Sequence, residues 1–266
     1  MTSVHTARPV GSLVKDWRIR RRRSQMDLAL EAGVSPRHLS FVETGRSRPS
    51  PELLLLLADR LDVPLRERNG LLLAAGYAPR FTKSDWDDAA MEKVTAALQR
   101  LLAGHDPYPG LVVDRQWNVV LANRAAQRLA ESLPTELVSP TMNVFRVGLH
   151  PDGLAGHTLN FREWAGYLLR QLHRLIVLTG DPEVVKLADE VAQYPNVAAL
   201  GDGHDTVPPD EPAIVVPWRL VLGGDELSLF TTLATFGTPL DITLDELSIE
   251  LFYPADERTE SILRSR

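Results

Sequence analysis

The chain contains no cysteine. This absence excludes disulfide bonds, thiolate zinc sites and cysteine nucleophiles, and it is typical of a protein kept in a reducing compartment. Long apolar runs are missing too, since the longest, residues 53–58, is far too short to span a bilayer. The beginning of the chain, MTSVHTARPVG, lacks the apolar core of a secretory signal. We therefore expect a cytoplasmic protein with no membrane association.

Motifs of common catalytic sites are absent as well. The sequence has no G-x-S-x-G, no P-loop and no H-E-x-x-H. His150, His157, His173 and His204 do not show metal-ligand spacing on one element, although His150 and His157 near Asp152 form a weak zinc pattern. We expect no catalytic residue, no metal and no cofactor, and hence a protein that is not an enzyme.

Charge is distributed unevenly along the chain. The whole chain has a formal charge of −6, yet residues 1–80 hold 14 Lys and Arg against 8 Asp and Glu. Such asymmetry between the two halves suggests that the N-terminal part meets an anionic partner. Two ordinary domains with different surfaces would show the same asymmetry, so charge alone does not decide between these interpretations.

The first 80 residues predict a compact bundle of short helices. Ser24, Ser35 and Ser50 are good N-caps, and proline follows the last two at the first helical position. Glycines stand where helices should end. We predict five helices, at residues 11–22, 24–32, 35–44, 50–61 and 65–75.

The third predicted helix has an unusual outward face. At 100° per residue, Leu39 and Val42 lie about 60° apart and define the buried side. The opposite side gathers side chains suited to a DNA major groove, where Arg can pair with guanine and Phe can pack on a thymine methyl. This outward face consists of Arg37, Ser40, Phe41 and Thr44, with His38 at its flank.

Residues around this helix have complementary predicted roles. Gln25 begins the second helix, where it can meet a phosphate, and Arg46, Ser47 and Arg48 are placed to touch the DNA backbone. A solvated loop is the alternative for these arginines. Glu43 lies next to the core side, and we predict that it pairs with Arg18. The candidate DNA contacts are Gln25, Ser35, Arg37, His38, Ser40, Phe41, Thr44, Arg46, Ser47 and Arg48.

The pattern S-Q-x-x-L-A-x-x-A-G-V-S, followed by a helix ending E-x-G-R-x-x-P-S, begins at Ser24 and ends at Ser50. It resembles the XRE-type helix-turn-helix of the phage repressor/Cro class over residues 11–77. The resemblance implies an all-α, five-helix domain whose third helix is the recognition helix. It also implies binding to a double-stranded DNA operator. A helical protein-interaction module of the same fold is the alternative.

The remainder of the chain predicts a second domain. Residues 1–10 form an N-terminal tail and residues 78–85 a polar linker, so the second domain covers residues 86–266. Pro217 interrupts the first of the late strand-like runs, which makes that run an edge strand, a bulge or two short strands. Hairpin, helices and late strands together favour an α+β domain with an antiparallel sheet. We predict helices at 87–103, 123–131, 161–178 and 182–192, and strands at 111–113, 117–121, 213–222, 226–237 and 246–254.

This second part resembles the MmyB-like transcription regulators. The resemblance lies in a strand–turn–strand ending at Leu121-Ala122-Asn123, the later helix with Trp164, and the segments LHPDGLAGHTLNFREW and FGTPLDITLDELSIELFYPAD. It implies a PAS-like ligand-binding domain for an apolar, fatty-acid-like effector.

Candidate ligand-binding residues are Trp117, Asn123, Phe145, Phe161, Trp164 and Phe230. Composition alone does not separate pocket from core, because ligand pockets are themselves apolar. Asn123 is equally suited to cap the helix that follows it. We expect a sequence-specific, homodimeric DNA-binding transcription regulator that senses a small apolar ligand. The alternative is that the C-terminal domain is a protein-interaction or dimerisation module without a ligand.

Overall fold

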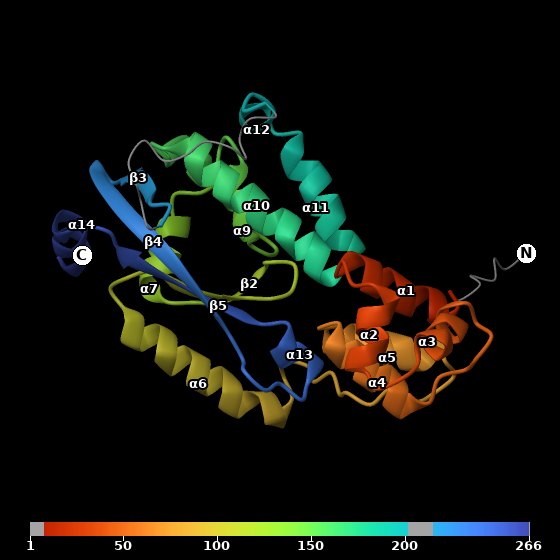
Figure 1. Ribbon diagram of the computed structural model, residues 1–266. Helices are drawn as coiled ribbons and strands as arrows, with labels where there is room; N and C mark the ends of the chain where they lie inside the picture. Colours follow the sequence, from red (N-terminus) through yellow and green to blue (C-terminus); the bar gives the residue numbers. More distant parts are fainter. Residues whose placement is uncertain (1–7, 202–214, 266) are drawn as a thin grey trace, which may run out of the picture. The chain divides into compact units, whose positions relative to one another are not determined.

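Two compact units make up the protein (Figure 1). The structure is a computed structural model that describes residues 8–201 and 215–265. The first unit runs to Ser84 and also includes residues 238–245, and the second unit holds residues 85–237 together with the chain from Glu246 onward. Residues 238–245, which we placed in the C-terminal domain, therefore lie with the DNA-binding part.

Helices make up most of the first unit, as predicted. Each of the serine N-caps Ser24, Ser35 and Ser50 accepts a hydrogen bond from a backbone N–H three residues further on, at 3.1–3.2 Å. The five predicted helices are confirmed as α1 (Val10–Arg20), α2 (Gln25–Glu31), α3 (Pro36–Glu43), α4 (Pro51–Arg60) and α5 (Leu65–Ala74).

One apolar cluster holds these helices together. Leu39 and Val42, which the spacing placed on the buried side of α3, are each only 1% exposed. Burying one such aliphatic side chain stabilises a fold by about 1.5–3 kcal/mol. The cluster includes Val14, Trp17, Leu28, Leu39, Leu54, Leu57, Leu61 and Leu72.

Residues 238–245 fasten the chain that follows α5. The carboxylate of Asp241 accepts hydrogen bonds from the Thr82 hydroxyl at 2.9 Å and from the backbone N–H and hydroxyl of Ser84, both at 3.0 Å. Burial raises the pKa of Asp241, but these hydrogen bonds outweigh it and hold the pKa below its usual value. The predicted linker is thus tied into the first unit.

The short helix α13 (Ile242–Asp245) completes this attachment. Its last residue, Asp245, accepts a hydrogen bond from the backbone N–H of Leu65 at 2.9 Å. Leu65 is the first residue of α5, and Pro64 before it offers no side-chain cap. A carboxylate from a distant part of the sequence therefore caps α5 and meets the positive end of its dipole.

A five-stranded sheet organises the second unit. All neighbouring strands pair antiparallel, in the order β2-β1-β5-β4-β3, which confirms the predicted antiparallel sheet. Pro217 lies just before β3, and residues 213–214 of the predicted run lie outside the described residues. The strands are β1 (Gly110–Val113), β2 (Val119–Ala122), β3 (Trp218–Leu222), β4 (Asp225–Thr235) and β5 (Ser248–Pro254).

Helices cover both faces of this sheet. The predicted helices are confirmed as α6 (Ala89–His105), α7 (Arg124–Ala130), α10 (Phe161–Thr179) and α11 (Pro182–Ala192). The side of α10 and α11 contains the core, whereas α6 runs along the other side (Figure 1). Shorter helices that the sequence did not predict are α8 (Thr135–Val138), α9 (Val144–Leu149), the 3₁₀ turn η1 (Leu154–His157), α12 (Pro195–Ala198) and α14 (Glu257–Arg264).

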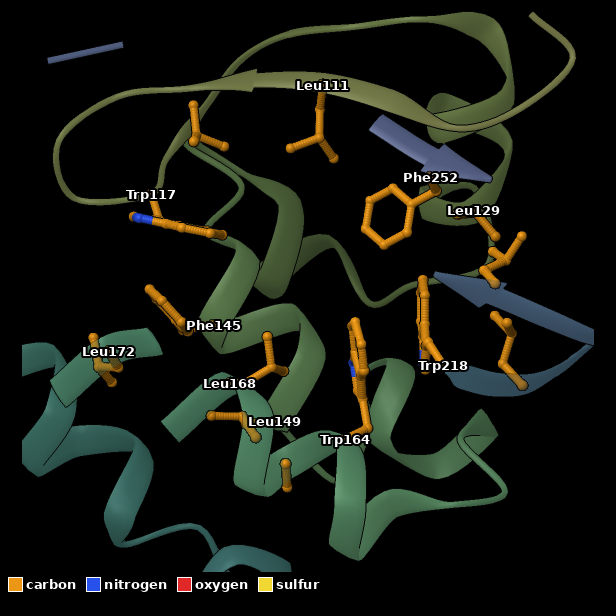
Figure 2. Packing of buried hydrophobic residues seen from close by; sticks show 14 of the residues in the cluster. Leu111, Trp117, Leu129, Phe145, Leu149, Trp164, Leu168, Leu172, Trp218 and Phe252 are labelled. Carbon is orange, nitrogen blue, oxygen red and sulfur yellow. The ribbon is translucent and has the colours of Figure 1, made fainter. Parts of the chain in front are cut away.

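Aromatic side chains form the centre of this core. Trp164 and Trp218 stack with ring centroids 5.4 Å apart and planes 9° apart, and Phe252 lies beside Trp218 (Figure 2). Trp117 packs on Phe145 at 4.9 Å. The indole N–H of Trp218 donates to the Thr158 hydroxyl at 3.0 Å, so this buried donor is satisfied.

Replacing Asp241 with alanine should loosen residues 238–245. The hydroxyls of Thr82 and Ser84 and the backbone N–H groups of Ser84 and Thr243 lose their shared acceptor, at an expected cost of about 1–3 kcal/mol. Hydrogen exchange should speed up at the amides of Ser84 and Ile242. Asp189→Ala, at an exposed position of α11, is the control and should change neither amide. Unchanged exchange in Asp241→Ala would contradict the attachment described above.

Candidate functional site

The outward face of α3 lies opposite Leu39 and Val42, as the helical spacing predicted. Arg37 and Thr44 are exposed, and Ser40, Phe41 and His38 are partly exposed. The Ser35 side chain caps the helix, so its oxygen accepts from the His38 N–H at 3.1 Å. Thr44 donates its hydroxyl to the Ser40 carbonyl at 2.7 Å. Contact of these residues with DNA stays a prediction.

Phe41 organises two of the predicted arginines. The guanidinium carbon of Arg37 lies 5.4 Å from the Phe41 ring centroid, and that of Arg46 lies 5.9 Å from it. Cations at this distance from an aromatic face are attracted by roughly 0.5–1 kcal/mol at exposed sites. The ring therefore gathers two positive charges beside the outward face of α3.

A buried ion pair fixes the back of α3. Arg18 binds Glu43 through two hydrogen bonds, from Nε to Oε1 at 2.6 Å and from Nη2 to Oε2 at 2.9 Å. The hydrogen bond to Glu43 raises the pKa of Arg18. The predicted pair is confirmed, and it joins α1 to α3. Gln25 of α2 adds a third bond, from its amide nitrogen to Oε2 at 2.6 Å, so this nitrogen points to Glu43 instead of a phosphate.

Arg48 has partners inside the first unit, and its contact with DNA stays a prediction. Its Nη2 donates to the Ala75 carbonyl at 2.6 Å, and its guanidinium carbon lies 4.6 Å from the Tyr77 ring centroid. The Tyr77 hydroxyl donates to the Pro49 carbonyl at 3.0 Å. Arg48 thus fastens the loop after α3 to the end of α5. Arg46 is exposed and Ser47 partly exposed, as expected for residues beside the backbone of DNA.

The second unit contains an apolar cavity between the sheet and the helices α7, α9 and α10. Its volume is about 70 Å³, or about 630 Å³ with the open space at its mouth. One water molecule occupies roughly 10–15 Å³ when volume is measured as for the smaller figure, so the enclosed part of the cavity holds several water-sized groups. Wall residues include Leu111, Val119, Leu129, Val147, Leu168 and Trp218.

Among the wall residues, Trp164 is the member of the predicted ligand set. Trp117 and Phe145 pack on each other in the core, and Phe161 only touches its edge. Trp117 has a φ of 63°, so it lies in the turn before β2, not in the strand that we predicted. Trp117 and Phe145 are therefore core residues, because a close-packed interior needs large apolar side chains, and Phe161 is partly buried beside them.

Asn123 and Phe230 also lie away from the wall. Asn123 caps α7 by accepting from the Ala126 N–H at 3.0 Å, and its amide donates to the Tyr108 carbonyl at 2.7 Å, so the capping alternative holds. Phe230 stacks on Tyr253 on the face of the sheet opposite the core. The reason is the two-residue alternation of β4, which turns the preceding residue, Leu229, inward.

Glu250 is a wall residue that the sequence analysis missed. It lies on β5 and is only 2% exposed. Its Oε1 accepts from the Thr231 hydroxyl at 3.0 Å, and within the described residues its Oε2 has no hydrogen-bond partner. Burial raises the pKa of Glu250 to about 7, although the Thr231 hydrogen bond opposes this. The available signal was a carboxylate between Ile249 and Leu251 in a strand-like run.

Comparison with protein families agrees with this two-unit organisation. The model described as "Helix-turn-helix" matches residues 14–68. The model described as "MmyB-like transcription regulator ligand binding domain" matches residues 94–265. A helix-turn-helix followed by a ligand-binding domain defines a DNA-binding transcription regulator. Because the second match covers more than half of the chain, the protein belongs to the MmyB-like transcription regulators.

Solved structures give weaker likenesses. The PAS domain from Bordetella pertussis BvgS is 16% identical, with a TM-score of 0.29, and the match covers 65% of this chain and 95% of that one. An RNA-binding Light-Oxygen-Voltage receptor is 15% identical, with a TM-score of 0.27, and the match covers 100% of this chain and 61% of that one. No curated protein matches. The α+β assignment therefore rests on the sheet itself.

Two further properties concern the described residues. None of their helices combines the length and the apolar character needed to cross a membrane. Within residues 8–201 and 215–265, no three His, Asp or Glu side chains converge in a way that could hold a metal ion.

Arg37→Ala should weaken binding to the cognate operator by about 1–3 kcal/mol and remove the preference at one base position. Arg46→Ala should instead weaken binding to all sequences and lower the slope of log K against log salt by about 0.9, because it removes a phosphate contact. Fluorescence anisotropy with operator and single-base variants measures both effects.

The charge-matched control for this pair is Arg170→Ala, at an exposed position of α10. It should leave affinity and base preference unchanged. An Arg37→Ala variant that keeps the full base preference would exclude Arg37 from base recognition.

Glu250 should also make stability depend on pH. Its pKa of about 7 in the folded protein lies above the ordinary value of 4.5, so the folded state binds the extra proton between these values. Stability should then fall as pH rises from about 4.5 to 7 and stay level above, by on the order of 3 kcal/mol in total. Glu250→Gln should remove this fall in urea unfolding curves. A wild-type curve that matches the variant at every pH would contradict the assignment.

Proposed function

We propose that this MmyB-like regulator binds its operator as a homodimer and senses a small apolar molecule in the cavity of its C-terminal unit. It acts in the cytoplasm and catalyses no reaction. The observation that carries the proposal is the cavity itself, whose wall is apolar apart from Glu250. Ligand sites are typically apolar hollows with a small number of polar groups that orient the ligand.

A homodimer is favoured by the size of the DNA-reading surface. One recognition helix contacts only a small number of base pairs, and two copies on half-sites one helical turn apart give useful specificity. The outward face of α3, with two guanidinium groups gathered at Phe41, is the surface that each copy presents to the major groove.

The proposed signal travels along the chain from β5 to residues 238–245. Glu250, in the cavity wall, lies on β5, and residues 238–245 connect β4 to β5. Within those residues Asp245 caps α5, and Asp241 holds Thr82 and Ser84. A ligand that shifts β5 also moves residues 238–245 and so alters the hydrogen bonds that Asp241 and Asp245 accept. It thereby biases the DNA-binding unit, provided that the ligand binds two arrangements with different affinities.

The experiment is native mass spectrometry of the full-length protein. The wild type should carry a small apolar molecule that is released at higher collision energy. Ala130 lies partly buried in the cavity wall, so Ala130→Phe should fill the space and lose that mass. Ala192→Phe, at an exposed position of α11, should retain it.

The same measurement tests the alternative in which the C-terminal unit is a protein-interaction or dimerisation module. In that case no small mass is carried, and a stable protein partner or an Ala130-independent dimer is found. A wild-type protein that is monomeric in native mass spectrometry but still carries the apolar mass would contradict the homodimer and leave the ligand-sensing proposal intact.

A further inference from the structure

Glu250 stands on the inward face of β5, two residues before the core residue Phe252. Its backbone lies between Leu111 of β1 and Leu233 of β4, in the middle of the sheet. Among the described residues the side chain has one hydrogen-bond partner, the Thr231 hydroxyl at 3.0 Å on Oε1. Oε2 is buried and, within the described residues, has no partner.

An unpaired buried carboxyl oxygen is costly. Leaving a buried acceptor unsatisfied costs about 1–3 kcal/mol, and more when the group is charged. No residue in the described part of the chain donates a hydrogen bond to Oε2. Tyr167 on α10 is close enough for the negative charge of Glu250 to raise its pKa, after the larger effect of burial. Its hydroxyl oxygen accepts from the amide of Gln171 at 3.3 Å.

The wall around Glu250 is otherwise apolar, with Leu111, Trp164, Trp218 and Phe252 among its members. A molecule that enters the cavity therefore meets hydrocarbon on most sides and one hydrogen-bond acceptor. A donor on that molecule would satisfy Oε2, whereas a purely apolar molecule would leave it unpaired.

We propose that the cavity selects an apolar molecule whose polar end donates a hydrogen bond to Oε2 of Glu250, namely an alcohol, an amide N–H or an amine. This inference rests on the proposed sensing function and narrows it. The ligand keeps the apolar chain of the fatty-acid-like effector expected from the sequence, but a carboxylate at its polar end is disfavoured.

The discrimination against a carboxylate is electrostatic. Two carboxyl groups at hydrogen-bonding distance in a place with little water cannot both be ionised, so one of them must take up a proton. Above neutral pH, protonating one of the two carboxylates costs free energy, and this cost lowers the affinity of the cavity for a fatty-acid anion. An ammonium or hydroxyl group of the same chain length carries its own proton.

The test compares three probes with the same hydrocarbon chain, octylamine, 1-octanol and octanoate. Isothermal titration calorimetry at pH 8 measures their binding to the full-length protein. The wild type should bind octylamine and 1-octanol at least tenfold more tightly than octanoate. In Glu250→Gln the amide neither repels octanoate nor attracts the ammonium, so the affinities of the two charged probes, octylamine and octanoate, should converge to within about threefold. Uncharged 1-octanol, which loses no ionic hydration in the apolar cavity, should still bind. Octanoate binding as tightly as octylamine to the wild type would overturn the proposal, and so would an unchanged preference for octylamine over octanoate in Glu250→Gln.

Two other variants keep this test sharp. Glu226→Gln changes an exposed carboxylate on β4 that pairs with Arg219, and it should keep the wild-type ranking. Thr231→Val keeps Glu250 and removes the donor to Oε1, but it leaves Oε2 facing the cavity, so the preference for octylamine over octanoate should be retained. Equal binding of octylamine and octanoate by Thr231→Val would count against Glu250 as the anchor, even if Glu250→Gln did not fold.

The outcomes also separate this inference from the proposed function. If the three probes bind the wild type equally and Ala130→Phe abolishes their binding, apolar sensing stands and the role of Glu250 is wrong. If none of the probes binds the wild type, both proposals are wrong.

Discussion

A carboxylate taken out of water must find partners, and two buried glutamates of this chain meet that requirement differently. Glu43 receives three hydrogen bonds, two from Arg18 and one from Gln25. Within residues 8–201 and 215–265, Glu250 receives one, from Thr231. Removing one partner of a buried ion pair typically costs 3–5 kcal/mol, so α1, α2 and α3 depend on the Glu43 arrangement for their mutual position. That position decides where the outward face of α3 points.

The difference between the two glutamates matches the difference between the two units. A DNA-reading helix has to be rigid, because base contacts depend on the register of a few side chains, and a fully satisfied buried network provides rigidity. A sensing domain needs a group whose surroundings improve when a ligand arrives. Oε2 of Glu250, which no described residue hydrogen-bonds and which lies in an apolar wall, is such a group within the proposed function.

Local patterns predicted a large part of the fold. The serine caps and terminal glycines marked the helices of the first unit, and the helical wheel correctly placed Leu39, Val42 and Glu43. The Arg18–Glu43 pair followed because a carboxylate beside the core needs a cation. Antiparallel strands were predicted from apolar runs, but the face to which each side chain turns was not. Phe230, a candidate ligand-binding residue, lies on the face of the sheet opposite the core.

The cavity was harder to predict because its wall comes from parts of the chain far apart in sequence. Residues 133–160 were irregular in the sequence, yet they supply Leu133, Met142, Val144, Val147 and Leu154 to the wall. Composition could not distinguish wall from core, since both are apolar. Glu250 had a recognisable signal, a lone carboxylate in an apolar strand, but its partner and its free oxygen depend on β4 and on the cavity. Likewise, no local pattern shows that Asp245 caps a helix 180 residues earlier.

Residues 238–245 also change what counts as a domain in this protein. Because they belong to the first unit, the chain passes between the two units three times: after Ser84, after Gly237 and after Asp245. A fragment cut after Ser84 would carry all five helices of the DNA-binding unit but neither Asp241 nor Asp245. Leu65 would lose its cap, and Thr82 and Ser84 would lose their shared acceptor. The smallest fragment of the DNA-binding unit that keeps these hydrogen bonds is therefore discontinuous in sequence. It joins residues 238–245 to the five helices through a designed connection.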